Sequence, residues 1–117
     1  MQFRLRIPSV AALGACLICS LAILDRAEAQ DAKAGGQKAE AVCAVCHGVD
    51  GLAKIPEAPN LAGQNERYLV EQLTAFKSGE RKNEMMSIVS QSLSDADIQN
   101  LAAYYSGIAM SLKPPAQ

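Results

Sequence analysis

The spacing of hydrophobic residues along the chain predicts helices. Within the stretch Asn65–Ser78, apolar residues recur every three or four positions, at Leu69, Leu73 and Phe76. This spacing places them on one face of a helix. Asn65 can cap the first turn of that helix, and Gly79 stands where a helix usually ends. We expect this helix to wall the interior of the fold and to carry no chemistry of its own.

A second apolar stripe at helical spacing lies near the C-terminus, at Ile98, Leu101, Ala102, Tyr105 and Ile108. Ser94 is followed three residues later by Asp97, a pair that resembles a capping box and marks the start of this helix. The proline-containing stretch 113–115 is expected to end it, because proline cannot continue a helix.

An alanine-rich segment, residues 32–44, predicts a first helix with Asp31 as its N-cap. Gly35 and Gly36 lie inside it, although each glycine disfavours a helix interior by about 1 kcal/mol. A backbone without side chains allows another helix to come close. We therefore expect Tyr104 or Tyr105 of the last helix to pack here, with fraying near a new N-terminus as the alternative.

The remaining segments contain no run with the alternation of a strand. Residues 48–64 are rich in proline and glycine and are predicted to form a loop, and residues 79–92 a polar segment between helices. The length of the chain suits one domain, which we place at residues 30–117. The sequence therefore predicts an all-α fold.

The most specific chemical signal is the segment Cys43-Ala44-Val45-Cys46-His47. Two cysteines separated by two residues and followed directly by a histidine are typical of covalent attachment of a c-type haem. Each thiol can add across one vinyl group of the haem, and His47 is then placed to bind the iron from one side. We expect one haem c per chain, attached through Cys43 and Cys46.

Zinc and a redox dithiol are the other uses of such a cysteine pair. A structural zinc site needs four ligands, but the chain has four cysteines and one histidine, and Cys16 and Cys19 lie in an apolar leader. A thioredoxin-like dithiol lies between a strand and a helix, and the sequence predicts no strand beside the motif. Haem is therefore favoured over zinc, a redox dithiol or a structural disulfide.

A haem iron bound by His47 also needs a group that orients the imidazole and a second axial ligand. The backbone carbonyl of Pro59 is our candidate for the first role. Met85 and Met86 follow His47 by about 40 residues, and a thioether paired with histidine raises the reduction potential. Methionine is more often a flexible filler of hydrophobic cores. Either of these two can serve as the second ligand, and Met110 is a weaker candidate.

The N-terminal residues have the three parts of a secretory signal peptide. A basic tip is followed by an apolar run over residues 7–24 and by a small-x-small sequence at 27–29. We expect residues 1–29 to be a signal peptide cleaved after Ala29. One alternative is an uncleaved membrane anchor, because about 18 apolar residues can span a bilayer. A lipoprotein attached at Cys16 is the other.

The net charge bears on the class of partner that the protein can bind, and the aromatic content on the size of its hydrophobic core. The chain has a net charge of -1 at pH 7, which argues against nucleic acid or an anionic membrane surface as its main partner. The part of the chain that follows the leader is short, and its aromatic residues are Tyr68, Phe76, Tyr104 and Tyr105. Such a chain builds a thin core, and a covalently bound haem would supply the missing apolar volume.

Motifs along nearly the whole chain after the leader resemble those of class I c-type cytochromes. The chain is similar, more narrowly, to one half of the diheme cytochrome c4 and to short single-haem bacterial cytochromes. The motifs lie at residues 43–48, 59–64, 67–69, 76–79, 85–86, 93–98 and 101–105. The resemblance implies a small single-haem cytochrome c fold, with crossing N- and C-terminal helices and the haem in the core. It also implies His47 as fifth ligand, the Pro59 carbonyl as its orienting partner, and Met86 rather than Met85 as sixth ligand.

Axial ligands from the protein on both faces leave the iron no open site for a substrate, so that one-electron exchange remains. We expect a periplasmic electron carrier, not an enzyme, that docks transiently on a donor and an acceptor. In the family that the chain resembles, haem is attached outside the bacterial inner membrane, which agrees with an export signal. The alternatives are a cytochrome subunit bound permanently to a larger dehydrogenase or oxidase, and a haem sensor or peroxidase with a labile methionine. Contact with a membrane is expected only if the leader stays uncleaved.

Overall fold

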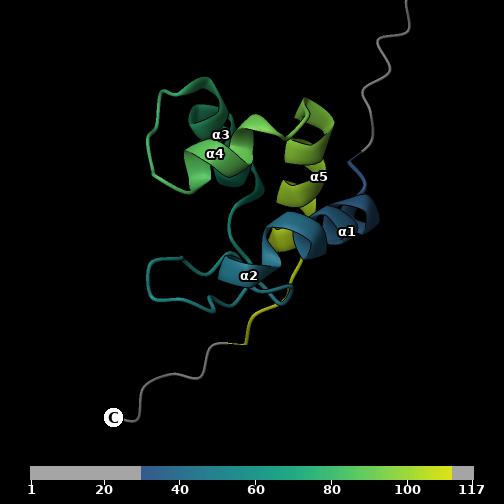
Figure 1. Cartoon of the computed structure of the whole chain (residues 1–117). Helices are drawn as coiled ribbons and strands as arrows, with labels where there is room; N and C mark the ends of the chain where they lie inside the picture. Colours follow the sequence, from purple (N-terminus) through teal and green to yellow (C-terminus); the bar gives the residue numbers. More distant parts are fainter. Residues whose placement is uncertain (1–29, 112–117) are drawn as a thin grey trace, which may run out of the picture.

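A computed structural model describes residues 30–111, and within this range the chain forms helices joined by loops, without strands. The helices are α1 (Ala32–Val42), α2 (Ala44–His47), α3 (Glu66–Ser78), α4 (Met86–Gln91) and α5 (Asp95–Ser106). Figure 1 shows α1 crossing the lower end of α5, with α3 and α4 beside α5 and α2 with its following loop below. The predicted all-α fold is confirmed for these residues. Residues 1–29, where a signal peptide is predicted, lie outside the described range.

The ends of the helices follow the predicted caps. The side chain of Asp31 accepts hydrogen bonds at the start of α1, and that of Asn65 does so at the start of α3. Gly79 ends α3 in the left-handed conformation, with φ of 82°. Ser94 and Asp97 form a capping box at the start of α5. Each of these caps is made within a few residues of chain, which is why sequence spacing identifies them.

Two predicted boundaries are wrong. The first helix ends at Val42 rather than at residue 44, and the chain resumes as the short helix α2 after Cys43. The last helix ends at Ser106, well before the prolines at 114–115. The N–H of Gly63, in the loop, donates to the Tyr105 carbonyl at 2.9 Å. The N–H of Ile108 also donates to this carbonyl, at 3.3 Å, so a carbonyl of the last turn is satisfied without a continuing helix.

The segment 79–92 also differs from the prediction, since it contains the helix α4. This helix has only 6 residues, and Ser90 is the one among them that is buried. Because the buried residue of α4 is a serine, this helix has no apolar stripe, and the spacing of hydrophobic residues does not predict it.

The core lies between α1, α3 and α5 and is built from Ala39, Leu69, Leu93, Ile98, Leu101, Ala102 and Tyr105. The two terminal helices cross at the predicted glycines. A side chain at Gly35 would overlap the backbone carbonyl of Asn100, and one at Gly36 would meet Cε2 of Tyr104 at 2.9 Å. The predicted approach of the last helix to the bare glycines is therefore confirmed, with Tyr104 as the contacting residue. Among the described helices, none has both the length and the apolar character needed to cross a membrane.

Candidate haem-binding site

His47 is the last residue of α2 and is buried, with 7% of its surface exposed. Its Nδ1 atom lies 2.9 Å from the backbone carbonyl oxygen of Pro59. A carbonyl oxygen only accepts hydrogen bonds, so Nδ1 carries the proton and donates it. Nε2 is then left with a free lone pair, which is the tautomer that binds a metal through Nε2. The contact is the one that the sequence analysis expects between these two residues.

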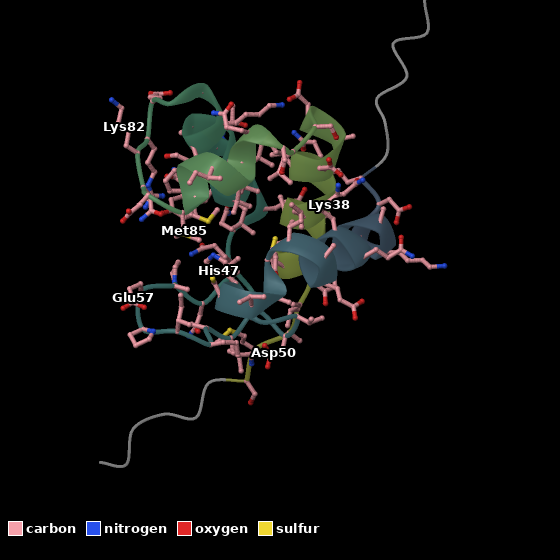
Figure 2. The ribbon with its side chains drawn as sticks, in the orientation of Figure 1. Lys38, His47, Asp50, Glu57, Lys82 and Met85 are labelled. Carbon is pink, nitrogen blue, oxygen red and sulfur yellow. The ribbon has the colours of Figure 1, made fainter. Side chains whose placement is uncertain are left out.

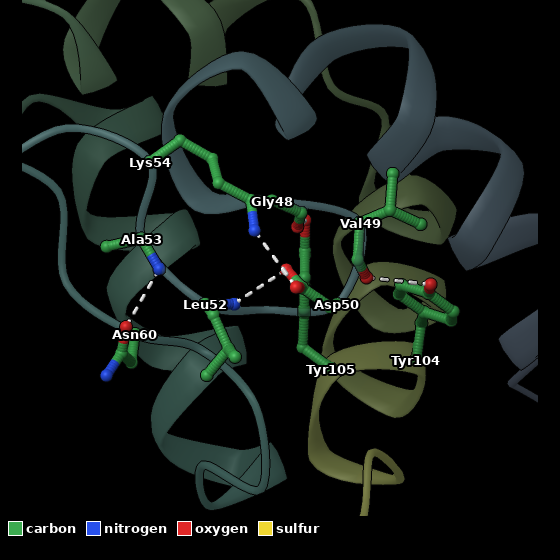
Figure 3. Close-up of polar contacts among 9 residues, drawn as sticks. All are labelled: Gly48, Val49, Asp50, Leu52, Ala53, Lys54, Asn60, Tyr104 and Tyr105. Carbon is green, nitrogen blue, oxygen red and sulfur yellow. Dashed lines mark hydrogen bonds and ion pairs between the residues drawn. The ribbon is translucent and has the colours of Figure 1, made fainter.

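Two tyrosines of α5 hold the chain where it leaves His47 (Figure 3). The Tyr105 hydroxyl donates to the carbonyl oxygen of Gly48 at 3.1 Å, and the Tyr104 hydroxyl donates to that of Val49 at 2.9 Å. Gly48 has a φ of 73°, a conformation that glycine adopts more readily than other residues. No local pattern in the sequence predicts these two bonds, because they join residues 57 and 55 positions apart.

The loop that carries Pro59 is closed by polar bonds of its own (Figure 3). The carboxylate of Asp50 accepts from the N–H of Leu52 at 3.1 Å and pairs with the Lys54 ammonium at 2.9 Å. The hydrogen bond from Lys54 is the largest cause that holds the pKa of Asp50 below its usual value. Asn60 Oδ1 accepts from the N–H of Ala53 at 2.8 Å. These bonds fold the loop back on itself, with Pro59 beside His47.

The two cysteines of the motif lie one turn apart, Cys43 between α1 and α2 and Cys46 within α2. Both thiols are free and half-buried. The N–H of His47 donates to the Cys43 carbonyl at 2.9 Å, so that the motif is one helical turn. Burial raises the pKa of the Cys43 thiol to about 11, an effect that a hydrogen bond with Tyr105 partly offsets. The Cys43 thiol therefore keeps its proton at neutral pH.

The two adjacent methionines lie at the start of α4. Met85 is 59% exposed, whereas Met86, the first residue of α4, is partly buried. In the view of Figure 2, Met85 lies opposite His47. Met110 lies beyond α5 and is 46% exposed. The fold therefore presents the start of α4 toward the motif and leaves Met110 outside the last helix.

Asn83 was not predicted as a functional residue, but its side chain holds the backbone of both methionines. Its Oδ1 atom accepts from the N–H of Met85 and from that of Met86, each at 3.0 Å. The N–H of Asn83 donates in return to Ser87 Oγ at 3.1 Å. An asparagine three residues before the helical residue that it caps is a local signal that could have revealed α4.

The donor groups fit a covalently attached haem with two axial protein ligands. His47 of α2 offers an imidazole nitrogen with a free lone pair. Cys43 and Cys46 offer two free thiols, and α4 offers the thioether of Met86. Over residues 30–111, no three His, Cys, Asp or Glu side chains lie close enough to hold a metal ion together. A structural zinc site needs four such ligands. An iron already held by a porphyrin needs only two more ligands.

Known proteins resemble this chain over most of the described residues. The family model described as "Cytochrome C oxidase, cbb3-type, subunit III" matches residues 30–104. The chain is 41% identical over 96 residues to cytochrome c4 of Pseudomonas aeruginosa, which covers 82% of this chain and 48% of that protein. It is 44% identical over 81 residues to cytochrome c-554(548) of Halomonas halodenitrificans, covering 67% of this chain and 96% of that protein.

A solved structure shows the same fold. The crystal structure of reduced recombinant cytochrome c4 from Pseudomonas stutzeri matches this one with a TM-score of 0.62 and 45% sequence identity. The match covers 68% of this chain and 46% of that chain. The chain thus spans about half the length of the cytochrome c4 relatives that it matches.

Proposed function

The chain belongs to this family of c-type cytochromes and binds haem c, and on this premise we propose that it is a periplasmic one-electron carrier with His47 and Met86 as axial ligands. One observation carries the proposal. The imidazole of His47 is buried and oriented by the Pro59 carbonyl through Nδ1, at 2.9 Å, and its Nε2 is free. A neutral histidine held in this way is suited to bind haem iron from one side.

In this proposal, Cys43 and Cys46 attach the haem. Each thiol would add across a vinyl group, with its sulfur going to one carbon and its hydrogen to the other, so that no oxidant or reductant would be consumed. The single turn between the cysteines sets the separation of the two sulfurs. Tyr105, through its bond to Gly48, holds the backbone that follows the motif.

The resemblance to class I c-type cytochromes supports Met86 over Met85 as the sixth ligand. Met86 is the first residue of α4, and its backbone N–H is held by Asn83. When bound, the haem supplies an iron that changes between the ferric and ferrous states. As ligands, His47 and Met86 would leave no position on the iron open for a substrate, and the thioether would favour the ferrous state. This supports electron transfer rather than catalysis.

Exposed apolar residues beside the motif support docking on other redox proteins. Val45, between the two cysteines, is 83% exposed, and Val49 and Leu52 are 42% and 43% exposed. Weak electron-transfer encounters use small surfaces of this kind. We propose one donor and one acceptor protein as partners. The periplasmic location depends on the signal peptide predicted in residues 1–29.

The same exposed residues favour a second candidate, a cytochrome subunit bound permanently to a larger dehydrogenase or oxidase. Apolar side chains such as Val45 are those that a permanent partner would cover. The two candidates differ in the size of the native particle. A carrier is expected to elute as a small free protein from an extract of its own host, and a subunit as part of a larger complex.

Variants of the exported holoprotein test the attachment and the ligands. Cys43→Ser combined with Cys46→Ser is expected to give no haem-stained band after denaturing electrophoresis. Met86→Ala is expected to lose the low-spin spectrum and to bind carbon monoxide in the ferrous state, whereas Met85→Ala, the matched control, keeps the spectrum and resists carbon monoxide. The opposite behaviour of the two methionine variants would move the ligand to Met85. Ready binding of carbon monoxide to the unsubstituted protein would contradict the carrier proposal.

A further inference from the structure

The backbone of Met86 is held from both sides by side chains outside the haem motif. On its N-terminal side, Asn83 Oδ1 accepts from the N–H of Met86 at 3.0 Å, and also from that of Met85. On its C-terminal side, the hydroxyl of Ser90 donates to the Met86 carbonyl at 2.7 Å. Ser90 is 0% exposed, so this bond is shielded from water. Both polar groups of this methionine's backbone thus have a side-chain partner.

Helix α4 is too short to hold this arrangement by itself. It has 6 residues, and an isolated helix below about 12 residues is barely stable in water. Met85, at the N-cap position, makes no side-chain cap bond. Asn83 therefore takes the role of the cap, and its N–H donates to Ser87 Oγ at 3.1 Å to complete a closed loop around the first turn.

The start of a helix decides which of two adjacent residues points inward. Successive residues of an α-helix differ by about 100° in direction, since a turn contains about 3.6 residues. Met85 and Met86 follow this rule, because one is exposed and the other is partly buried. If the first turn began one residue earlier, Met85 would take the position that Met86 now has as the first residue of α4.

We propose that Asn83 is a positioning residue that sets the start of α4, so that Met86 rather than Met85 faces the haem iron and stays on it. This inference rests on the proposed function, in which Met86 is the sixth ligand. Asn83 acts through the backbone and does not touch the iron. Its loss leaves the ligand present but lets the segment that carries it open more often.

The experiment measures the rate at which cyanide binds to the ferric holoprotein, together with the absorption band of the thioether–iron bond. Asn83→Ala is expected to raise the rate about fivefold and to weaken the band, because it removes a helix cap. Asn83→Asp keeps an acceptor oxygen and should restore values close to those of the unsubstituted protein. Asn65→Ala is the matched control: it removes the asparagine cap of α3, whose Oδ1 accepts from Tyr68 at 3.0 Å, and should change the rate less than about twofold.

The outcomes separate this inference from the proposed function. If Met86→Ala keeps the thioether band and resists cyanide, the ligand assignment itself fails. If Met86→Ala opens the iron while Asn83→Ala behaves like Asn65→Ala, the ligand stands and the positioning role is refuted. Should Asn83→Ala not accumulate as holoprotein, Asn83→Gln replaces it, because glutamine keeps the amide but caps poorly. An unchanged cyanide rate in that variant would also overturn the inference.

Discussion

Replacing Gly35 with alanine tests the crossing of α1 and α5, on which the position of the haem motif depends. The added methyl group would overlap the backbone carbonyl of Asn100 and lie 2.9 Å from Cβ of Tyr104. A backbone carbonyl inside a helix cannot turn aside, so α1 and α5 must move apart. Overpacking of this kind costs about 3 kcal/mol at the upper end of its usual range. Alanine recovers about 1 kcal/mol through its better helix propensity, which leaves a net loss of about 2 kcal/mol.

Urea unfolding of the holoprotein, followed by far-UV circular dichroism, measures this loss. With a slope near 1.5 kcal/mol per molar urea, about 2 kcal/mol lowers the midpoint by roughly 1.3 M. Gly36→Ala is the matched control, because its methyl group would meet the side-chain ring of Tyr104 rather than a backbone carbonyl. We expect the control to lie within about 1 kcal/mol of the unsubstituted protein, since the propensity gain offsets the contact. If Gly35→Ala is as stable as the unsubstituted protein or more so, the helices do not cross closely here and the start of α1 is frayed.

Two further predictions concern α5. Tyr105→Phe removes the hydroxyl that donates to Gly48. We expect the free energy of unfolding to fall by about 1 kcal/mol and the melting temperature by about 4–8 °C. An unchanged melting temperature would show that the bond contributes nothing. The hydrogen bond from the Ser94 N–H holds the pKa of Asp97 below its usual value of 3.8. Because the folded-state pKa is the lower one, this stabilisation is present above pH 3.8 and is lost as the pH falls through the folded pKa. Asp97→Asn, which cannot titrate, should therefore lose less stability on acidification, as followed by melting temperature; equal losses would refute the assignment.

Local signals in the sequence predicted much of this molecule. The cap residues Asn65 and Ser94, the stop at Gly79 and the cysteine–histidine motif all act within a few residues of chain. The expected contact between His47 and Pro59, 12 positions apart, is also present. Helix α4 has no apolar stripe in its sequence, because its first turn is held by polar side chains and its buried residue is a serine.

The amino-acid sequence by itself determined the three longer helical segments, where each of them starts, and which residues offer sulfur and nitrogen to a haem. Only the tertiary structure decided that α5 stops at Ser106, that Gly35 meets a backbone carbonyl, and that Tyr105 reaches Gly48. The physical reason is range. A cap or a stripe is set by the geometry of one helix, whereas these contacts depend on how two helices far apart in the chain lie against each other in space.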